Sequence, residues 1–210
     1  MSRRSPAAPP RFLRTRSWKD APWVALDFET TGLDFRRDAI VSFGLVPIRE
    51  ARIEMAGARY REVSPGVPPS PESIRVHHLR RLDLELAPSL EDVREELAAG
   101  LERQFLITWV AEVEANFLAK IFSSGTGRWL RRTLDAYQLA RYVELMDRPS
   151  SGEEGRGLES TVRRFGIPVE DTHHALDDAF MTAELFLVLA SRLSTQGVAS
   201  VRSLMRAARP

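Results

Sequence analysis

The stretch of residues 23–34, WVALDFETTGLD, constrains the fold of this chain more than any other. Its first four residues are apolar and predict a buried strand, which ends in two carboxylates, Asp27 and Glu29. Because side chains at positions i and i+2 of a strand project from the same face, the two carboxylates stand side by side. A hard divalent cation such as Mg²⁺ or Mn²⁺ explains this pairing, since it prefers oxygen ligands. An ordinary polar strand end followed by a turn explains it too.

The composition limits the available chemistry to carboxylates and histidines. The 210 residues include no cysteine, which excludes disulfides, zinc–thiolate sites and thiol nucleophiles, and they include four histidines. A hydrophobic content of 43% and a charged content of 28% suit a globular protein. No apolar run is long enough for a membrane span or a signal peptide, so we expect a cytoplasmic protein with no membrane partner. The net charge of +1 does not by itself indicate nucleic-acid binding.

The order of the segments indicates three parts. Residues 1–20 are rich in proline, serine and arginine and predict a flexible basic arm, which could contact phosphates without sequence preference. Residues 21–195 form the main domain, and residues 196–210 form a C-terminal tail or a short helix, at 198–208.

Hydrophobic patterns predict an α/β fold for the main domain. After the opening strand, further strands are predicted at 39–48, 52–63, 105–110 and 129–133, of which the one at 52–63 is weaker and is broken near Gly57. Helices are predicted at 71–79, 89–101, 112–122, 134–146, 158–165 and 175–193. The early strands suggest an antiparallel meander, and the later alternation of helix and strand adds parallel strands. The result is a mixed five-stranded sheet flanked by helices.

A second stretch with candidate site residues is HHALDDA, at 173–179. His173 comes just before the predicted helix, and Asp178 lies five residues later, in its first turns. Alanines at 175 and 179 give this helix a narrow face for close packing on a sheet, so that Asp178 can face Asp27 and Glu29. A favourable interaction of Asp178 with the helix dipole is the alternative explanation.

The third stretch, WVAEVEANFL at 109–118, follows a predicted buried strand. Glu114 lies on an amphipathic helix here, where a glutamate taken alone is more typical of a solvated residue than of a metal ligand. Only its combination with the other two stretches makes it a candidate.

Together the three stretches resemble the DEDD family of 3′-to-5′ exonucleases. Within it they resemble the subgroup with a histidine before the last aspartate, which includes the proofreading epsilon subunit of bacterial DNA polymerase III and ribonuclease T. DFETTGLD at 27–34 is similar to the first motif of the family and HHALDDA to the third, and the resemblance extends over residues 23–193. The middle motif departs from the pattern: Trp109 and Val110 stand where the family has His-Asn, and Glu114 stands where it has aspartate.

The resemblance implies a ribonuclease H-like fold and a site that binds two Mg²⁺ or Mn²⁺ ions. It implies that the four metal ligands are Asp27, Glu29, Glu114 and Asp178. In this family the histidine, here His173, takes a proton from the attacking water. By the same resemblance, the residues that contact the terminal nucleotide are Thr30, Thr31, Leu33 and His77, the last within IRVHHL.

The implied activity is hydrolysis at the 3′ end of DNA, which releases nucleoside 5′-monophosphates in proofreading or repair. The expected partners are single-stranded DNA or frayed 3′ ends, with a DNA polymerase as a further candidate. One alternative is an exoribonuclease that acts on RNA or short oligoribonucleotides. Another is a catalytically weakened domain that binds without cutting, which only the altered middle motif supports.

Overall fold

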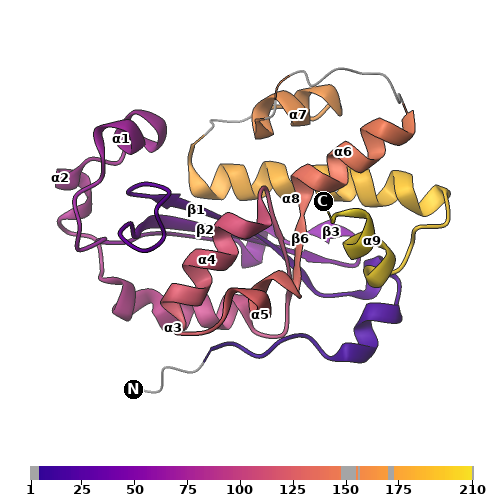
Figure 1. The fold of residues 1–210 in the computed structure, drawn as a ribbon, viewed down its shortest axis with the longest axis horizontal. Coiled ribbons are helices and arrows are strands. Elements are labelled where there is room, and N and C mark those ends of the chain that lie inside the picture. The colour runs from indigo at the N-terminus through magenta and orange to yellow at the C-terminus, as the bar shows by residue number, and fades with distance from the viewer. Residues whose placement is uncertain (1–4, 148–154, 156, 170–172, 210) are drawn as a thin grey trace.

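The computed structural model of the chain describes residues 5–147, 155, 157–169 and 173–209. A mixed sheet forms its centre, with the order β3-β2-β1-β5-β6 and with β4 paired to β2 (Figure 1). The strands are β1 (Trp23–Thr30), β2 (Ile40–Arg49), β3 (Arg52–Ile53), β4 (Arg59–Glu62), β5 (Phe105–Thr108) and β6 (Thr133–Asp135). β1 is antiparallel to β2 and parallel to β5, and β5 is parallel to β6.

The predicted mixed sheet is confirmed, but it has six strands in the described part of the chain instead of five. The predicted third strand is divided into β3 and β4 by a 3₁₀ turn at Met55–Gly57, next to the glycine at which a break was expected. Both pieces pair with β2, so the division adds a strand without changing the topology.

Helices cover both faces of the sheet, and the alternation of side chains along β1 assigns its residues to the two cores. Trp23 and Ala25 pack with α6 (Ala136–Asp147), α7 (Leu158–Arg164), α8 (Ala175–Thr195) and α9 (Val201–Ala207). Val24 and Leu26 pack on the other face with α3 (Leu90–Leu101), α4 (Ala111–Ile121) and α5 (Thr126–Leu130). By the same alternation, Asp27 and Glu29 project toward the face that α8 covers. No helix in the described residues is both long and hydrophobic enough to span a bilayer.

The helix predictions were largely right, since the local signals were clear. Ser89 caps α3 as expected: its hydroxyl accepts the Asp92 N–H, and the Asp92 carboxylate accepts the Ser89 N–H at 3.0 Å. Two short helices, α1 (Pro71–His77) and α2 (Arg81–Leu84), lie in the segment between β4 and α3, beside the end of β1 (Figure 1).

The strand predicted at 129–133 was wrong. Trp129 lies in α5 and is fully buried; its ring packs on Phe122 at 5.4 Å, and its indole N–H donates to Ser124 at 2.8 Å. The apolar side chain therefore fills the core between α4 and α5, and the strand begins only at Thr133.

Residues 5–20 pack against the domain, which differs from the predicted flexible arm; residues 1–4 lie outside the described part. Trp18 is 1% exposed, and its indole N–H donates to Ser194 Oγ at 2.7 Å at the end of α8. Ala7 O accepts a hydrogen bond from the buried guanidinium of Arg132 at 2.7 Å. The two terminal segments also meet, since Ser17 and Ser200 form an antiparallel bridge just before α9. The buried ring of Trp18 holds this segment against the domain, and the prediction of a flexible arm did not take this residue into account.

Candidate active site

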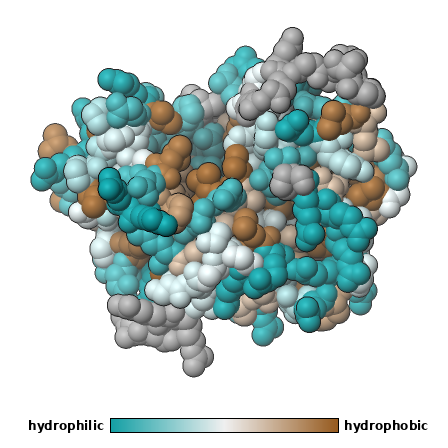
Figure 2. All heavy atoms as spheres, viewed as in Figure 1, coloured by the Kyte–Doolittle hydropathy of each residue, from teal (hydrophilic) through white to brown (hydrophobic). Residues whose placement is uncertain are grey.

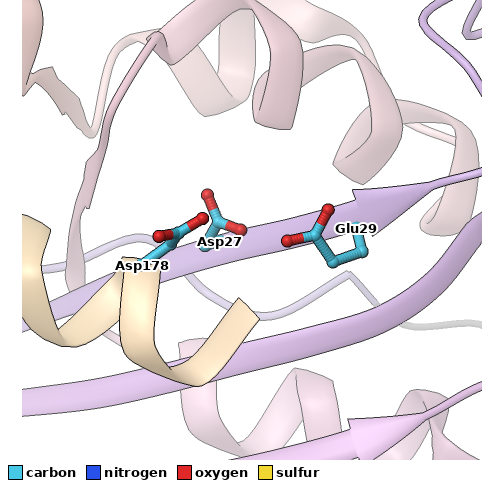
Figure 3. Close-up of side chains that lie close together, drawn as sticks. All are labelled: Asp27, Glu29 and Asp178. Atoms are coloured by element: carbon cyan, nitrogen blue, oxygen red, sulfur yellow. The ribbon is translucent and has the colours of Figure 1, made fainter. Parts of the chain in front are cut away.

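Three of the predicted carboxylates meet at the end of β1. Asp27 and Glu29 come from the strand, and Asp178 comes from the first turn of α8. One oxygen of each side chain lies within 4.8 Å of the corresponding oxygens of the other two. Figure 3 shows the carboxyl groups of Asp27 and Asp178 turned toward each other, with that of Glu29 directed at the same space.

A glycine on the neighbouring strand makes this convergence possible. Gly44 of β2 is the register partner of Asp27, and a Cβ placed on it would lie 2.1 Å from the carbonyl oxygen of Ala175. The first residues of α8 therefore rest directly on the backbone of β2, which brings Asp178 to Asp27. Gly44 was not among the predicted site residues, although a lone glycine inside a strand is a known signal of close backbone approach.

His173 precedes α8 in a left-handed backbone conformation, with φ of 67°. Its backbone N–H donates to Asp178 Oδ2 at 3.1 Å, which fixes the carboxylate, while the side chain itself is exposed. The neighbouring His174 has other contacts: its Nδ1 lies 2.9 Å from Asp177 Oδ2, and its ring stacks on Tyr60 at 4.3 Å. Of the two histidines, His173 is thus the one with an exposed side chain and a direct hydrogen bond to Asp178.

Burial, and for Asp27 and Glu29 also repulsion from neighbouring carboxylates, raises the pKa values of this group. Burial raises the pKa of Asp27 well above its usual value, and repulsion from Glu29, Glu114 and Asp178 adds to the shift. Burial, then the charge of Asp178, raises the pKa of Glu29 to about 7. Burial raises the pKa of Asp178 to about 6, against the opposing effect of the His173 N–H. A cation among them would relieve this repulsion.

Glu114 lies next to this group but is not part of the cluster of three. It is 5% exposed on α4, and its Oε2 is buried without a hydrogen-bond partner in the described structure. Burial, with a contribution from Asp135, raises the pKa of Glu114 to about 8, and its charge acts on Asp27 in turn. Three clustered carboxylates and a fourth with a free buried oxygen form a donor set that fits a hard divalent cation.

At the two substituted positions before α4, Trp109 and Val110, the middle motif brings no polar side chain to the site. Trp109 packs edge-on against Tyr137, with ring centroids 5.3 Å apart. Val110 precedes α4 and makes no side-chain cap. The N-terminus of α4 is held instead by Asp135, whose carboxylate accepts the Ala111 N–H at 2.9 Å. Asp135 was not among the predicted site residues, because it ends β6, and the strand predicted in this region stopped at residue 133.

The residues expected to contact a terminal nucleotide surround the end of β1 but differ in how accessible they are. Leu33 is 79% exposed, whereas Thr30 and His77 are buried. The Thr31 hydroxyl is already engaged in the turn, where it donates to Asp38 Oδ1 at 2.9 Å and accepts the Ala39 N–H at 3.1 Å. Thr31 therefore positions the turn that follows β1.

His77 is the last residue of α1 and is buried. Its Nδ1 accepts the Leu79 N–H at 3.0 Å, and its Nε2 is buried with no partner among the described residues. Burial lowers its pKa, which favours the neutral imidazole.

Comparison with known proteins identifies the family. The model of the RNase T exonuclease family matches residues 24–186, a range that includes all the residues of the site. The chain belongs to the exonuclease family. This confirms the family that the motifs suggested, while membership of the histidine-containing subgroup stays a prediction.

Curated relatives of this exonuclease domain are longer proteins. The PolC-type DNA polymerase III of Thermotoga petrophila is 29% identical over 189 residues, which cover 90% of this chain and 13% of the polymerase. The same enzyme of Staphylococcus haemolyticus is 24% identical over 191 residues, which cover 90% of this chain and 13% of that one. The exonuclease domain thus corresponds to about an eighth of each relative.

Solved structures confirm the ribonuclease H-like fold. Escherichia coli exonuclease I, in a zinc-bound complex with single-stranded DNA, has a TM-score of 0.71 at 13% identity, over 83% of this chain and 41% of that one. Exonuclease X, in complex with a duplex DNA that has a 5′ overhang, has a TM-score of 0.64 at 18% identity, over 89% of this chain and 99% of that one. Both are similar in fold at low sequence identity.

Proposed function

We propose that the protein is a metal-dependent 3′-to-5′ exonuclease that removes nucleoside 5′-monophosphates from the end of a DNA strand. The observation that carries this proposal is the convergence of Asp27, Glu29 and Asp178 from two elements far apart in the sequence. The DNA complexes of exonucleases I and X support DNA as the substrate, because these proteins share the fold.

In this proposal the carboxylates hold two Mg²⁺ or Mn²⁺ ions. When bound, the ions supply positive charge and Lewis acidity at the scissile phosphate. Asp27, Glu29 and Asp178 would hold the ions together with Glu114, whose Oε2 on α4 has no hydrogen-bond partner among the described residues. Glutamate is one methylene longer than the family's aspartate, so its carboxylate can still bind a metal ion if the helix is slightly displaced.

His173 would act as the general base. Its side chain is exposed at the start of α8 and adjacent to Asp178, where an attacking water needs to lose a proton. Leu33 lies exposed beyond β1, where it can pack on the terminal base. The neutral His77 accepts the Leu79 N–H at Nδ1, so its Nε2–H can donate a hydrogen bond to the nucleotide. The chain thus orients the 3′ nucleotide from the turn after β1.

The test is digestion of a 5′-labelled single-stranded DNA with Mn²⁺ or Mg²⁺. We expect a ladder of products that shorten from the 3′ end, release of 5′-mononucleotides, and no products with EDTA or with the Asp27→Asn variant. The matched control is Glu95→Gln, which removes an exposed carboxylate on α3 and should retain full activity. Digestion by Asp27→Asn at the wild-type rate would refute the proposal. Digestion of an RNA of the same sequence, measured in parallel, shows whether the protein cleaves DNA or RNA faster.

The PolC-type relatives further support action at a primer terminus. We therefore expect faster removal of a mispaired than of a paired 3′ nucleotide on a duplex primer. Equal rates on both would argue against proofreading and leave the exonuclease assignment intact.

A further inference from the structure

A cleft of about 970 Å³ lies outside the carboxylate cluster, between the C-terminal helix and the β6 edge of the sheet. Its walls come from α9, α5, the start of α4, the end of β6 and the N-terminal segment. Five arginines line it: Arg14, Arg131, Arg202, Arg206 and Arg209. Figure 2 shows hydrophilic side chains gathered over α9, which carries two of these arginines and precedes a third.

These arginines face one another with little neutralisation. None of the five forms an ion pair within the part of the chain that the structure describes, and two carboxylates, Glu112 and Asp135, line the same cleft. Asp135 already accepts the backbone N–H groups of Ala111 and Gln138. Burial lowers the pKa of Arg14, and the nearby charges of Arg11, Arg202, Arg131 and Arg209 lower it further, as expected for like charges crowded together.

The cleft also adjoins the carboxylate site. Val110 and Ala111 line it at the start of α4, one turn before Glu114. Asp135 connects the two sites electrostatically, because it lines the cleft and its charge raises the pKa of Glu114. A bound chain could therefore run from the cleft to the end of β1.

We propose that this cleft binds the phosphodiester backbone of the nucleic-acid strand on the 5′ side of the nucleotide being removed. This inference rests on the proposed function. Guanidinium groups bind phosphate oxygens through paired hydrogen bonds, and a row of them binds a polyanion without regard to base sequence. The cleft thereby favours long substrates over short ones and keeps a strand bound between successive cleavages.

The test compares Arg202→Gln/Arg206→Gln with a control that removes the same charge elsewhere. Arg52→Gln/Arg59→Gln is suitable, because both arginines are exposed on β3 and β4, away from β6 at the far side of the sheet. Binding of a labelled 20-nucleotide DNA is measured by anisotropy in EDTA over a range of salt concentrations. We expect about tenfold weaker binding for the cleft variant at moderate salt. The slope of log K against log salt should become shallower by about 1.4, which is about 0.7 for each lost contact on a single strand.

A second measurement separates this inference from the proposed function. Hydrolysis of a dinucleotide with Mn²⁺ should proceed at the wild-type rate in the cleft variant, because so short a substrate does not reach the cleft. Arg202→Lys/Arg206→Lys, which keeps the charge, should restore the salt slope. An unchanged affinity and slope for the 20-nucleotide strand would overturn the cleft proposal while the exonuclease assignment stands. Failure of the wild-type protein to cleave any substrate would overturn the assignment itself.

Discussion

Asp27 and Gly44 are paired directly across the antiparallel ladder of β1 and β2, and the absent side chain of Gly44 lets α8 carry Asp178 to Asp27. The geometry of the site thus depends on a residue with no functional group. The positions of the carboxylates therefore depend on the packing of α8 against β2, because any change that lifts α8 from β2 separates Asp178 from Asp27.

Gly44→Ala should impair both folding and activity. The added methyl group overlaps the Ala175 carbonyl, so the start of α8 must move; we expect a loss of about 1 to 3 kcal/mol in the free energy of unfolding. The exonuclease rate should fall by about 10²-fold, because displacements of about 1 Å have such effects on catalysis. Urea denaturation and single-turnover digestion measure the two effects. The control is Gly125→Ala, where an added Cβ has no neighbour within 4 Å; wild-type activity in Gly44→Ala would disprove this role.

Asp178→Asn should stabilise the metal-free protein at alkaline pH. The folded pKa of Asp178, about 6, lies above that of the unfolded chain, about 3.9, so the proton is bound more tightly in the folded state. The stability that this proton contributes is complete below about pH 4 and is lost as the pH rises through 6. At pH 8 without metal we expect the variant to exceed the wild type by about 1 to 2 kcal/mol, with no difference at pH 4.

When Mn²⁺ is added at pH 8, the wild type should become more stable than Asp178→Asn, since it then gains binding energy that the variant lacks. Thermal denaturation at several pH values, with Glu95→Gln as the control, measures both effects. A variant less stable than the wild type at pH 8 in EDTA would contradict the raised pKa of Asp178.

Glu114→Gln should weaken metal binding without weakening the fold. The raised pKa of Glu114, about 8, leaves the metal-free side chain largely protonated at pH 7, and glutamine has nearly the shape of the protonated acid. We expect the free energy of unfolding at pH 7 to change by less than about 0.5 kcal/mol. Calorimetry should show at least tenfold weaker Mn²⁺ binding, or the loss of one of two binding events. Glu112→Gln, on the exposed side of the same helix, should bind as the wild type does; equal Mn²⁺ affinity in both variants would exclude Glu114 as a ligand.

His173→Asn should slow hydrolysis and leave metal binding intact. Asparagine tolerates the left-handed backbone of this position and keeps the N–H that holds Asp178, but it cannot take the proton. A decrease of about 10²- to 10⁴-fold is expected for the loss of a general base, with partial recovery when free imidazole is added. His78→Asn is a matched control, because His78 has a similar φ of 61° and is exposed. A full rate in His173→Asn would assign the proton transfer elsewhere.

Local signals made much of the fold predictable. The capping box at Ser89, the helical periodicity of α4 and α8 and the apolar run before Asp27 each depend on residues close in sequence. The strand misplaced at 129–133 shows the limit of this information. Trp129 suits a strand and a buried helix equally well, and only its packing on Phe122 decides between them.

The site was predictable in its residues but less so in its geometry. The spacing of Asp27 and Glu29 on a strand gives their shared face, whereas the distance from Asp178 depends on Gly44, which lies on another strand. The Thr31 hydroxyl could not be assigned from sequence either, since its partner Asp38 faces it only after the turn has formed.

The bridge between Ser17 and Ser200 also limits how far the N-terminal segment can be shortened. Trp18 follows directly after this bridge, is 1% exposed, and donates its indole N–H to Ser194 Oγ on α8. Removal of residues 1–20 would therefore uncover apolar surface on α8 and leave the hydroxyl of Ser194 without this partner. A shortened protein should be less stable than the full chain, although the truncation removes none of the carboxylates of the site.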